Sequence, residues 1–518
     1  MVGTLDDATI TEYFRNKSVL ITGSTGFLGK ILVEKILRVQ PGVRRIYLPV
    51  RAADSAAARR RVETEVVGKE LFRVLREQHD GGFDDFIMEK VVALAGDVTH
   101  EAFGIDATTL RDLQLADELH VIVNSAATTN FYERYDVALD VNVMGVKHMC
   151  AFAKKCPNLE VLLHVSTAYV AGEKQGLVQE KPFRDGETLR DGTHLDMDVE
   201  LRLAKDVKKQ MEADPDSPPK AERKAMKDLG LSRARHFGWP NTYVFTKSVG
   251  EMVLGMEMRG EGNVPAVIIR PSIITSIKND PLPGWIEGTR TIDTFIIGYA
   301  KQNLSCFLAD LNLIMDVMPG DMVVNAMMAA TAAHASVSSF TTLPEKMEPQ
   351  PPPQPPAVYH VSSSLRHPAT YAVLYRTGIR YFEEHPQVGP DGRAMRAHKM
   401  RFMGNITAFH LFMIIKYRLP LEILRLLSIL CCGLFGLASL YNDLDRKYRF
   451  MMRLVEVYGP FSLFKGFFDD VNLNRLRLSM AENGIDHVGL FNFDPKTVDW
   501  DNYFSNIHIP GVMKYVFK

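Results

Sequence analysis

Tyr243 and Lys247 are four positions apart in a stretch with a helical pattern. Side chains at this spacing lie on one face of a helix, about one turn from each other. An ammonium group beside a phenol favours the phenolate, so the pair is suited to moving a proton at a substrate oxygen. An isolated Tyr-x-x-x-Lys is also common as an ordinary helical pair. The catalytic interpretation therefore depends on the motifs upstream.

Two hydroxyl residues, Ser166 and Thr167, end an apolar run at 161–165 that has the pattern of a strand. Ligands bind at the carboxyl ends of strands in open α/β sheets. Because strand residues alternate between faces, one hydroxyl can face a site while the other packs away from it. Counting back from Gly172, we predict Thr167 as the catalytic hydroxyl, with Ser166 as the second candidate.

A glycine-rich run at 22–29 follows a strand-like run at 18–21 and precedes a helix-like run at 30–37. Gly23 allows a tight turn, Gly26 lets backbone N–H groups approach a pyrophosphate, and Gly29 lets the helix pack closely. The N-terminus of the helix then faces the phosphates. The spacing Gly-x-x-Gly-x-x-Gly resembles that of the short-chain dehydrogenase/reductase superfamily. A plain strand–helix turn is the alternative, since a glycine pattern alone is weak evidence.

Arg51 follows the second predicted strand, at 45–50, and no acidic residue appears before Asp54. An acid at this strand end would bond the ribose 2′-hydroxyl of NAD. A guanidinium instead suits a 2′-phosphate, because its planar fork can hold phosphate oxygens. We therefore predict NADP(H), with a solvated loop arginine as the alternative.

The superfamily resemblance implies further cofactor contacts at the ends of later strands. Asp97 and Val98 lie at the carboxyl end of the strand at 90–98 and are expected near the adenine, while the strand at 120–127 and the strand and loop at 264–272 supply further contacts. The predicted cofactor-binding residues are Thr22, Gly23, Ser24, Thr25, Gly26, Phe27, Leu28, Gly29, Arg51, Asp97, Val98, Asn124, Ala126, Tyr243, Lys247, Pro271 and Ser272.

Bulk composition limits the classes of protein to consider. A chain of 518 residues is too long for one ordinary domain. The chain has 61 Lys and Arg against 62 Asp and Glu, and this near-neutral net charge does not indicate a protein that binds nucleic acid. Its five cysteines lack the paired spacing of a disulfide or zinc framework, so we expect no metal site and a reducing compartment. No feature of the sequence sets an oligomeric state.

Two long segments lie outside these strand motifs. A helix is expected over 56–77. The charged segment 173–237 fits either a solvated amphipathic insertion or a basic lid near a phosphorylated substrate.

Beyond residue 365 the chain becomes helical in pattern and rich in Met, Leu and Phe. We predict a doubly wound, parallel, Rossmann-like catalytic domain with insertions at 1–365 and a mainly helical domain at 366–518.

The combined motifs resemble the alcohol-forming fatty acyl-CoA reductases, and the plant-type enzymes in particular. The resemblance is carried by the glycine-rich run at 22–29 and by the segments 165–170, 238–251, 270–274 and 283–286. The run Trp-Pro-Asn-Thr-Tyr at 239–243 is far more specific than Tyr-x-x-x-Lys. The resemblance extends over most of the chain, including the helical C-terminal part.

This resemblance implies that a long-chain acyl-CoA is reduced by two NADPH to a primary alcohol, through an enzyme-held aldehyde and with release of CoA. Thr167 and Tyr243 would donate hydrogen bonds to the carbonyl oxygen, and Tyr243, tuned by Lys247, would supply the proton. One alternative is a related reductase or epimerase that acts on a ketone or a nucleotide sugar. A second is a non-catalytic NADP-binding protein.

An apolar, uncharged run at 426–441 is shorter than the roughly 20 residues of a spanning helix. Basic residues flank it, and cations near a membrane surface attract anionic headgroups. They are Lys416, Arg418, Arg425, Arg446, Lys447 and Arg449. We expect the protein to lie on the cytosolic face of the endoplasmic reticulum membrane, with a cytoplasmic protein and a buried helix pair as the alternative.

Overall fold

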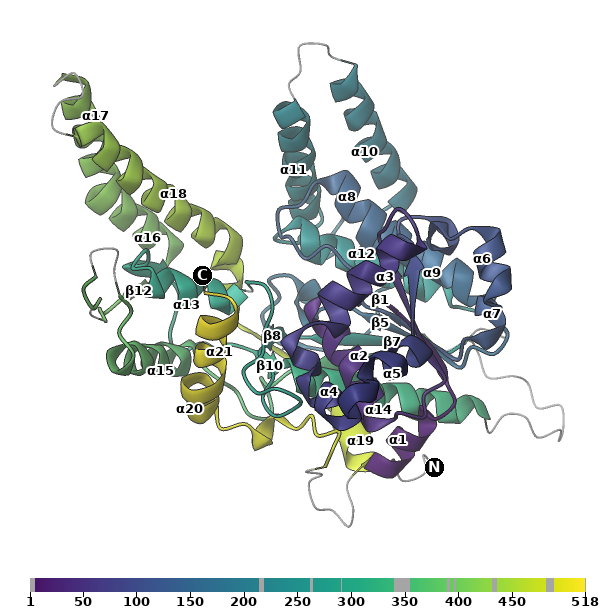
Figure 1. The fold of residues 1–518 in the computed structure, drawn as a ribbon. Helices are drawn as coiled ribbons and strands as arrows, with labels where there is room; N and C mark the ends of the chain where they lie inside the picture. The colour runs from purple at the N-terminus through teal and green to yellow at the C-terminus, as the bar shows by residue number, and fades with distance from the viewer. Residues whose placement is uncertain are drawn as a thin grey trace.

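The computed structural model describes residues 5–213, 219–260, 264–289, 291–339, 355–388, 392–395, 397–430, 436–480 and 489–517. Within these residues, the centre is a parallel sheet in the order β11-β7-β5-β4-β1-β2-β3 (Figure 1). Its strands are β1 (Ser18–Thr22), β2 (Arg45–Val50), β3 (Val91–Ala95), β4 (Val121–Asn124), β5 (Val161–Val165), β7 (Ala266–Pro271) and β11 (Ala357–Val361). The strand order reverses at β1 and β4, where doubly wound sheets bind ligands. The predicted Rossmann-like fold is confirmed.

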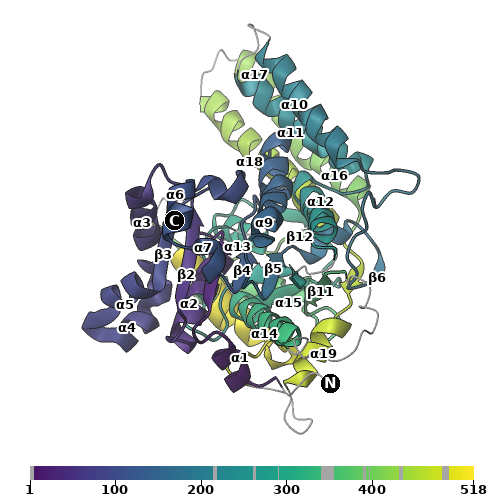
Figure 2. The ribbon, with the colours of Figure 1, turned by 90° about the vertical axis from the view of Figure 1, so that its right-hand side faces the viewer.

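Helices cover both faces of the sheet (Figure 2). They include α2 (Phe27–Val39), α9 (Gly145–Ala153), α12 (Thr242–Glu257) and α14 (Gly320–Ser339). Val19 and Ile21 of β1 pack in the cluster that contains α2 and α14, whereas Leu20 packs in the cluster that contains α9 and α12. Parallel strands that are buried on both faces require continuous apolar runs, which the sequence has at these positions.

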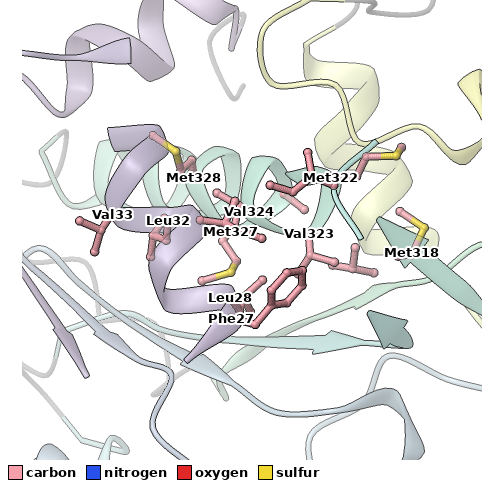
Figure 3. Close-up of a cluster of buried hydrophobic side chains, with 14 of the residues drawn as sticks. Phe27, Leu28, Leu32, Val33, Met318, Met322, Val323, Val324, Met327 and Met328 are labelled. Carbon is pink, nitrogen blue, oxygen red and sulfur yellow. The ribbon is translucent and has the colours of Figure 1, made fainter. Parts of the chain in front are cut away.

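The contact between α2 and α14 anchors the first helix of the fold. Figure 3 shows the side chains of this layer, which include Phe27, Leu28, Leu32, Val33, Val323, Val324, Met327 and Met328. Phe27, the first residue of α2, also stacks on Trp285 with ring centroids 5.3 Å apart. Because the glycine-rich loop leads directly into Phe27, this packing fixes the loop against the sheet.

The helix expected over 56–77 is interrupted. It consists of α3 (Ser55–Val62), a π-helical turn (Glu63–Val67), a 3-10 turn (Glu70–Phe72) and α4 (Arg73–His79). The break occurs at Gly68 and Lys69, where Lys69 has an extended backbone with ψ of 155°. This change of direction buries Leu71 and Phe72 completely, so tertiary packing outweighs helical continuity here.

The segment 173–237 contains a helical hairpin of α10 (Met197–Glu212) and α11 (Pro219–His236), which projects from the sheet (Figure 1). Its base is held by buried polar contacts. The Tyr135 hydroxyl donates to Glu200 Oε2 at 2.7 Å, and Arg233 forms an ion pair with the same carboxylate at 2.5 Å.

The C-terminal part is helical, as expected, but it is interleaved with the N-terminal part. Its helices are α15 (Tyr371–Glu384), α16 (Ile406–Met413), α17 (Leu419–Leu430), α18 (Leu437–Ser462), α19 (Val471–Ser479), α20 (Trp500–Asn502) and α21 (Ile509–Tyr515). Strand β12 (Arg401–Met403) pairs with β9 (Cys306–Leu308), and β13 (Gly466–Phe468) pairs with β6 (Gly176–Val178). The division at residue 365 stays a prediction, because the two parts share strand pairs and a core.

Short elements complete the connections. They are α1 (Asp7–Tyr13), α5 (Phe83–Lys90), α6 (Ala107–Asp112), α7 (Leu115–Glu118), α8 (Tyr135–Leu139), α13 (Thr291–Ala300), β8 (Ile273–Thr275) and β10 (Val317–Pro319). No helix within the described residues combines the length and the apolar character needed to cross a membrane.

Candidate active site

The backbone of the loop between β1 and α2 packs closely against neighbouring backbone atoms. Gly23 has φ of +70°, and an added Cβ would lie 2.7 Å from the backbone nitrogen of Ala126. At Gly29, an added Cβ would lie 2.5 Å from the carbonyl oxygen of Gly23. Gly26 is the N-cap of α2 and gives the first turn no side-chain hydrogen bond. A helix N-terminus presented in this way is suited to the phosphates of a dinucleotide.

A cavity of about 1200 Å³ opens in front of this loop, at the carboxyl edge of the sheet. It brings together most of the residues predicted from the sequence. Its walls include Gly23, Thr25, Gly26, Phe27, Leu28, Gly29, Arg51, Asp97, Val98, Ala126, Ser166, Thr167, Tyr243, Lys247, Pro271 and Ser272. None of the described residues of the insertion 173–237 lines it, although Lys227 and Asp228 of α11 contact Tyr132 of its wall, so both interpretations of that segment stay predictions.

Thr22, Ser24 and Asn124 are the predicted site residues that do not line this cavity. All three are buried behind its wall. The Thr22 hydroxyl donates to Asn124 Oδ1 at 2.9 Å and accepts hydrogen bonds from the backbone N–H groups of Ser125 and Ala126, both at 3.1 Å. Thr22 and Asn124 therefore shape the wall that Ala126 presents.

The run Trp-Pro-Asn-Thr-Tyr positions the catalytic helix. The Trp239 indole is buried and donates to the carbonyl oxygen of Val170 at 2.8 Å, which joins the start of α12 to the segment after β5. Asn241 is the N-cap of α12, and its side chain accepts from the backbone N–H of Val244 at 3.0 Å. Such a cap stabilises a helix by about 1 kcal/mol. Tyr243 is thereby held in the first turn, with its ring stacked on Phe131 at 5.7 Å.

Lys247 lies one turn further along α12 and is only 1% exposed. Its ammonium donates to the carbonyl oxygen of Val165 at 2.7 Å and lies 3.3 Å from Nε2 of His164. Burial lowers the pKa of Lys247 to about 8, although the Glu251 carboxylate acts in the opposite direction. Glu251 is itself held in a buried ion pair with Arg270 at 2.5 Å. These contacts hold the lysine side chain in one position, and its charge changes near pH 8.

The two candidate hydroxyls lie immediately after β5 and both line the cavity. The Thr167 hydroxyl is 3.4 Å from the carbonyl oxygen of Pro271 and accepts from the backbone N–H of Tyr169 at 3.3 Å. Ser166 Oγ is buried, and no described residue forms a hydrogen bond with it. The structure therefore brings Thr167, Ser166, Tyr243 and Lys247 to one cavity, and their catalytic roles stay predictions.

At the far end of the cavity, Arg51 is exposed beside Arg61 of α3. Arg61 donates to the carbonyl oxygen of Arg51 at 2.6 Å and forms an ion pair with Glu65 at 2.7 Å. Asp97 accepts from the backbone N–H and the hydroxyl of Thr99, both at 3.0 Å. The glycine-rich loop, the exposed Arg51 and the hydroxyl–lysine cluster fit a nicotinamide dinucleotide.

Sequence reasoning missed three residues of the site. His164 connects Lys247 to Asn124, whose amide nitrogen lies 3.2 Å from His164 Nδ1. Burial strongly lowers the pKa of His164, with the Lys247 charge adding to the effect, so the imidazole is neutral. The other two are Arg61 and Phe131. A signal existed only for Arg61, which belongs to a basic run at 59–61 just after Arg51.

Comparison with known proteins agrees with this geometry. A family model described as Male sterility protein matches residues 21–327, and a second model with the same description matches residues 416–518. Fatty acyl-CoA reductase 1 of Arabidopsis thaliana is 44% identical over 99% of this chain and 100% of its own length. Alcohol-forming fatty acyl-CoA reductase of Simmondsia chinensis is 42% identical over 98% of this chain and 99% of its own.

The fold also matches solved structures. The reductase domain of a nonribosomal peptide synthetase from Mycobacterium tuberculosis superposes with a TM-score of 0.53 at 16% identity, covering 98% of this chain and 97% of that domain. At this identity the likeness concerns the fold alone. The sequence matches reach much further, because they extend over nearly the whole length of both proteins. The chain belongs to the fatty acyl-CoA reductase family.

Proposed function

We propose that this protein reduces long-chain fatty acyl-CoA to a primary alcohol, with NADPH as reductant, and that it holds the aldehyde between the two reductions. The observation that carries the proposal is the shared cavity. It places Thr167, Tyr243 and Lys247 in front of the glycine-rich loop. Family membership supports the same chemistry, since relatives at 42–44% identity are named as fatty acyl-CoA reductases.

The bound cofactor supplies hydride, and the residues of the chain orient the reaction. Thr167 and Tyr243 donate hydrogen bonds to the carbonyl oxygen of the substrate as negative charge develops on it. Collapse of the resulting hemithioacetal releases CoA as the thiol and leaves the aldehyde. In the second reduction the Tyr243 hydroxyl gives its proton to the alkoxide oxygen. Lys247 is fixed by Val165 and His164, so its charge is already oriented before the substrate arrives.

The preference for NADPH over NADH is proposed from Arg51, whose backbone Arg61 holds in place. Arg51 and Arg61 both line the far end of the cavity, and Arg61 is tethered to the backbone of Arg51. The exposed Arg51 guanidinium suits a dianionic 2′-phosphate, whereas a 2′-hydroxyl gains little from it, and Arg61 is paired with Glu65. This is the second support for NADPH beside the missing acidic residue after β2.

The experiment that tests the proposal is product analysis of the purified protein with acyl-CoA and either NADPH or NADH. We expect a primary alcohol, with two NADPH consumed for each CoA released and slower turnover with NADH. Aldehyde as the end product would limit the activity to one reduction. Turnover of a nucleotide sugar or ketone without acyl-CoA turnover would place the protein with related superfamily enzymes. Cofactor binding without turnover of any of these substrates would indicate a non-catalytic protein.

We further propose that the helical hairpin formed by α17 and α18 lies on a membrane surface, at the cytosolic face of the endoplasmic reticulum. The hairpin projects away from the body of the protein (Figure 1). Its apolar side chains are widely exposed, with Leu426 at 60% and Leu430 at 77%. Arg446 and Arg449 of α18 are exposed as well, and they form ion pairs with Asp443 and Asp445. An apolar face with neighbouring cations is the pattern of an interfacial helix.

Cosedimentation with anionic vesicles tests this placement. The double variant L426D/L430D should lose most vesicle binding, because two charges would enter the interfacial region. Leu478 of α19 is also exposed, at 52%, and provides the matched control, since L478D should bind vesicles normally. Wild-type protein that stays in the supernatant at low salt would contradict the proposal and support a cytoplasmic protein. Localisation to another membrane in fractionated cells would contradict the assignment to the endoplasmic reticulum.

A further inference from the structure

Three buried polar side chains behind the cavity wall form a hydrogen-bonded chain that ends at Lys247. Thr22 of β1 is the register partner of Asn124 in β4, and Asn124 is the register partner of His164 in β5. Their side chains therefore lie on the same face of the sheet. Each is at most 4% exposed, and none of the three lines the cavity. They act on the site only through the residues that they contact.

The direction of the hydrogen bonds is fixed at Thr22. A hydroxyl group has one hydrogen to donate and two lone pairs. Both lone pairs are used, because the oxygen accepts from the backbone N–H groups of Ser125 and Ala126, both at 3.1 Å. The hydroxyl must therefore donate its hydrogen, and Asn124 Oδ1 accepts it at 2.9 Å. This contact assigns the oxygen and nitrogen ends of the Asn124 amide.

The orientation of Asn124 in turn sets the tautomer of His164. With Oδ1 toward Thr22, the amide nitrogen of Asn124 donates to His164 Nδ1 at 3.2 Å. Burial strongly lowers the pKa of His164, so the imidazole is neutral and carries a single hydrogen. Because Nδ1 accepts, that hydrogen lies on Nε2. The opposite tautomer would set an N–H of the imidazole against an N–H of the amide.

The hydrogen on His164 Nε2 is directed toward Lys247, whose Nζ lies 3.3 Å away. An ammonium group has three hydrogens and no lone pair, so it cannot accept this hydrogen, whereas a neutral amine can. The contact consequently stabilises the form of Lys247 that has given its proton away. The hydrogen bond from Nζ to the carbonyl oxygen of Val165, at 2.7 Å, is open to both forms of the lysine.

Other titratable groups near Lys247 lie on α12 and β7. Tyr243 and Glu251 are one turn to either side of it on α12, and Arg270 of β7 holds Glu251 in an ion pair at 2.5 Å. Burial lowers the pKa of Lys247 to about 8, and the Glu251 carboxylate acts in the opposite direction. His164 differs from these groups because it contributes a directed N–H rather than a charge.

We propose that Thr22 and Asn124 hold His164 as the Nε2–H tautomer. Directed at Lys247, this N–H favours release of the lysine proton to Tyr243 during alcohol formation. The inference rests on the proposed function and assigns three positioning residues to it. After Tyr243 gives its proton to the alkoxide oxygen, the phenolate recovers a proton from the Lys247 ammonium. The neutral amine that remains accepts the His164 N–H, and it regains a proton from solvent through the cavity that it lines.

The pH–rate profile of His164 variants tests the proposal. H164L removes the N–H that stabilises the neutral amine, so the alkaline decline of kcat should move up by about one pH unit. Added apolar surface alone would lower the pKa of Lys247 and move the decline to lower pH, so the direction of the shift separates the two effects. H164Q should return the decline close to its wild-type position, because its amide nitrogen can face Lys247 while its oxygen accepts from Asn124.

His334 of α14 provides the matched control. Its Nε2 lies 2.8 Å from the Tyr359 hydroxyl, and neither residue lines the cavity. H334L should therefore keep the wild-type alkaline decline.

Variants of Thr22 test the remote end of the chain. T22V removes the hydroxyl, so the Asn124 amide can turn over and His164 can accept a hydrogen bond from the Lys247 ammonium. The alkaline decline should then move to higher pH, as in H164L. T22S keeps the hydroxyl and should keep the wild-type position of the decline. Titration with NADPH identifies folded variants, and if T22V fails to fold, the His164 variants decide alone.

Nuclear magnetic resonance of protein with ¹⁵N-labelled histidine reads the tautomer without turnover. Comparison with H164Q identifies the His164 signals among the 15 histidines of the chain. We expect Nε2–H in the wild type. A wild-type Nδ1–H tautomer overturns the proposal, as does an alkaline decline that stays in place or moves to lower pH in folded H164L. Wild-type protein that reduces no acyl-CoA overturns the proposed function, while the spectrum still decides the tautomer.

Discussion

Replacing Tyr243 by phenylalanine removes one hydroxyl and leaves the surrounding packing in place. The tyrosine ring is stacked on Phe131 with an interplanar angle of 7°, and a phenylalanine ring can occupy the same position. Lys247 is held by Val165 and His164, so its position does not depend on the lost oxygen. Binding of NADPH should therefore stay close to that of the wild type.

The expected loss of kcat follows from the two tasks assigned to that hydroxyl. A positioned proton donor contributes about 10²–10⁴-fold to a rate, and an oxyanion donor about 10²–10³-fold. Thr167 stays in place as the second hydrogen-bond donor, so the rate of the first reduction should fall less than that of the second. We therefore expect kcat for alcohol formation to fall by at least about 10²-fold, or roughly 2.7 kcal/mol in activation free energy.

Single-turnover assays with acyl-CoA and with free aldehyde, together with NADPH titration, measure this effect. Tyr132 offers the control, because it also lines the cavity while its hydroxyl donates to Asp228 of α11. Y132F should turn over at nearly the wild-type rate. Near-normal alcohol formation by Y243F would refute the role of Tyr243. An equal loss of activity and of NADPH affinity would show that the ring position had not been preserved.

Three further predictions concern the cofactor and the lysine. K247A should weaken NADPH binding by about tenfold or more, and unchanged affinity by fluorescence titration would remove Lys247 from the cofactor site. R51A should raise the KM for NADPH by about tenfold and leave that for NADH nearly unchanged, whereas equal effects would make Arg51 structural. Because burial lowers the pKa of Lys247 to about 8, the lysine is charged below that pH and neutral above it. Turnover should therefore decline as pH rises through about 8, and a pH–rate profile that stays flat well above this value would contradict the role of the charge.

The motifs near the glycine-rich loop were predictable because they are local. Strand, turn and helix follow one another within about twenty residues, and glycine spacing there reports backbone geometry directly. The expected helix over 56–77 was wrong as a continuous element, since Leu71 and Phe72 turn into the core at a break that periodicity alone does not reveal. Thr22 and Asn124 were named as site residues because of their neighbours in the chain, yet both lie behind the cavity wall.

The sequence by itself determined the fold class, the glycine-rich loop and the spacing of Tyr243 and Lys247, because each depends on residues close together in the chain. Only the tertiary structure decided what surrounds them. His164 reaches Lys247 across 83 positions, and Phe131 meets Phe461 of α18 from the opposite part of the sequence. The burial that lowers the pKa of Lys247, and the hydrogen-bonded chain from Thr22 to Lys247, arise from contacts between such distant segments. Periodicity and local spacing do not encode contacts of this kind, because they depend on how complete helices and strands pack against one another.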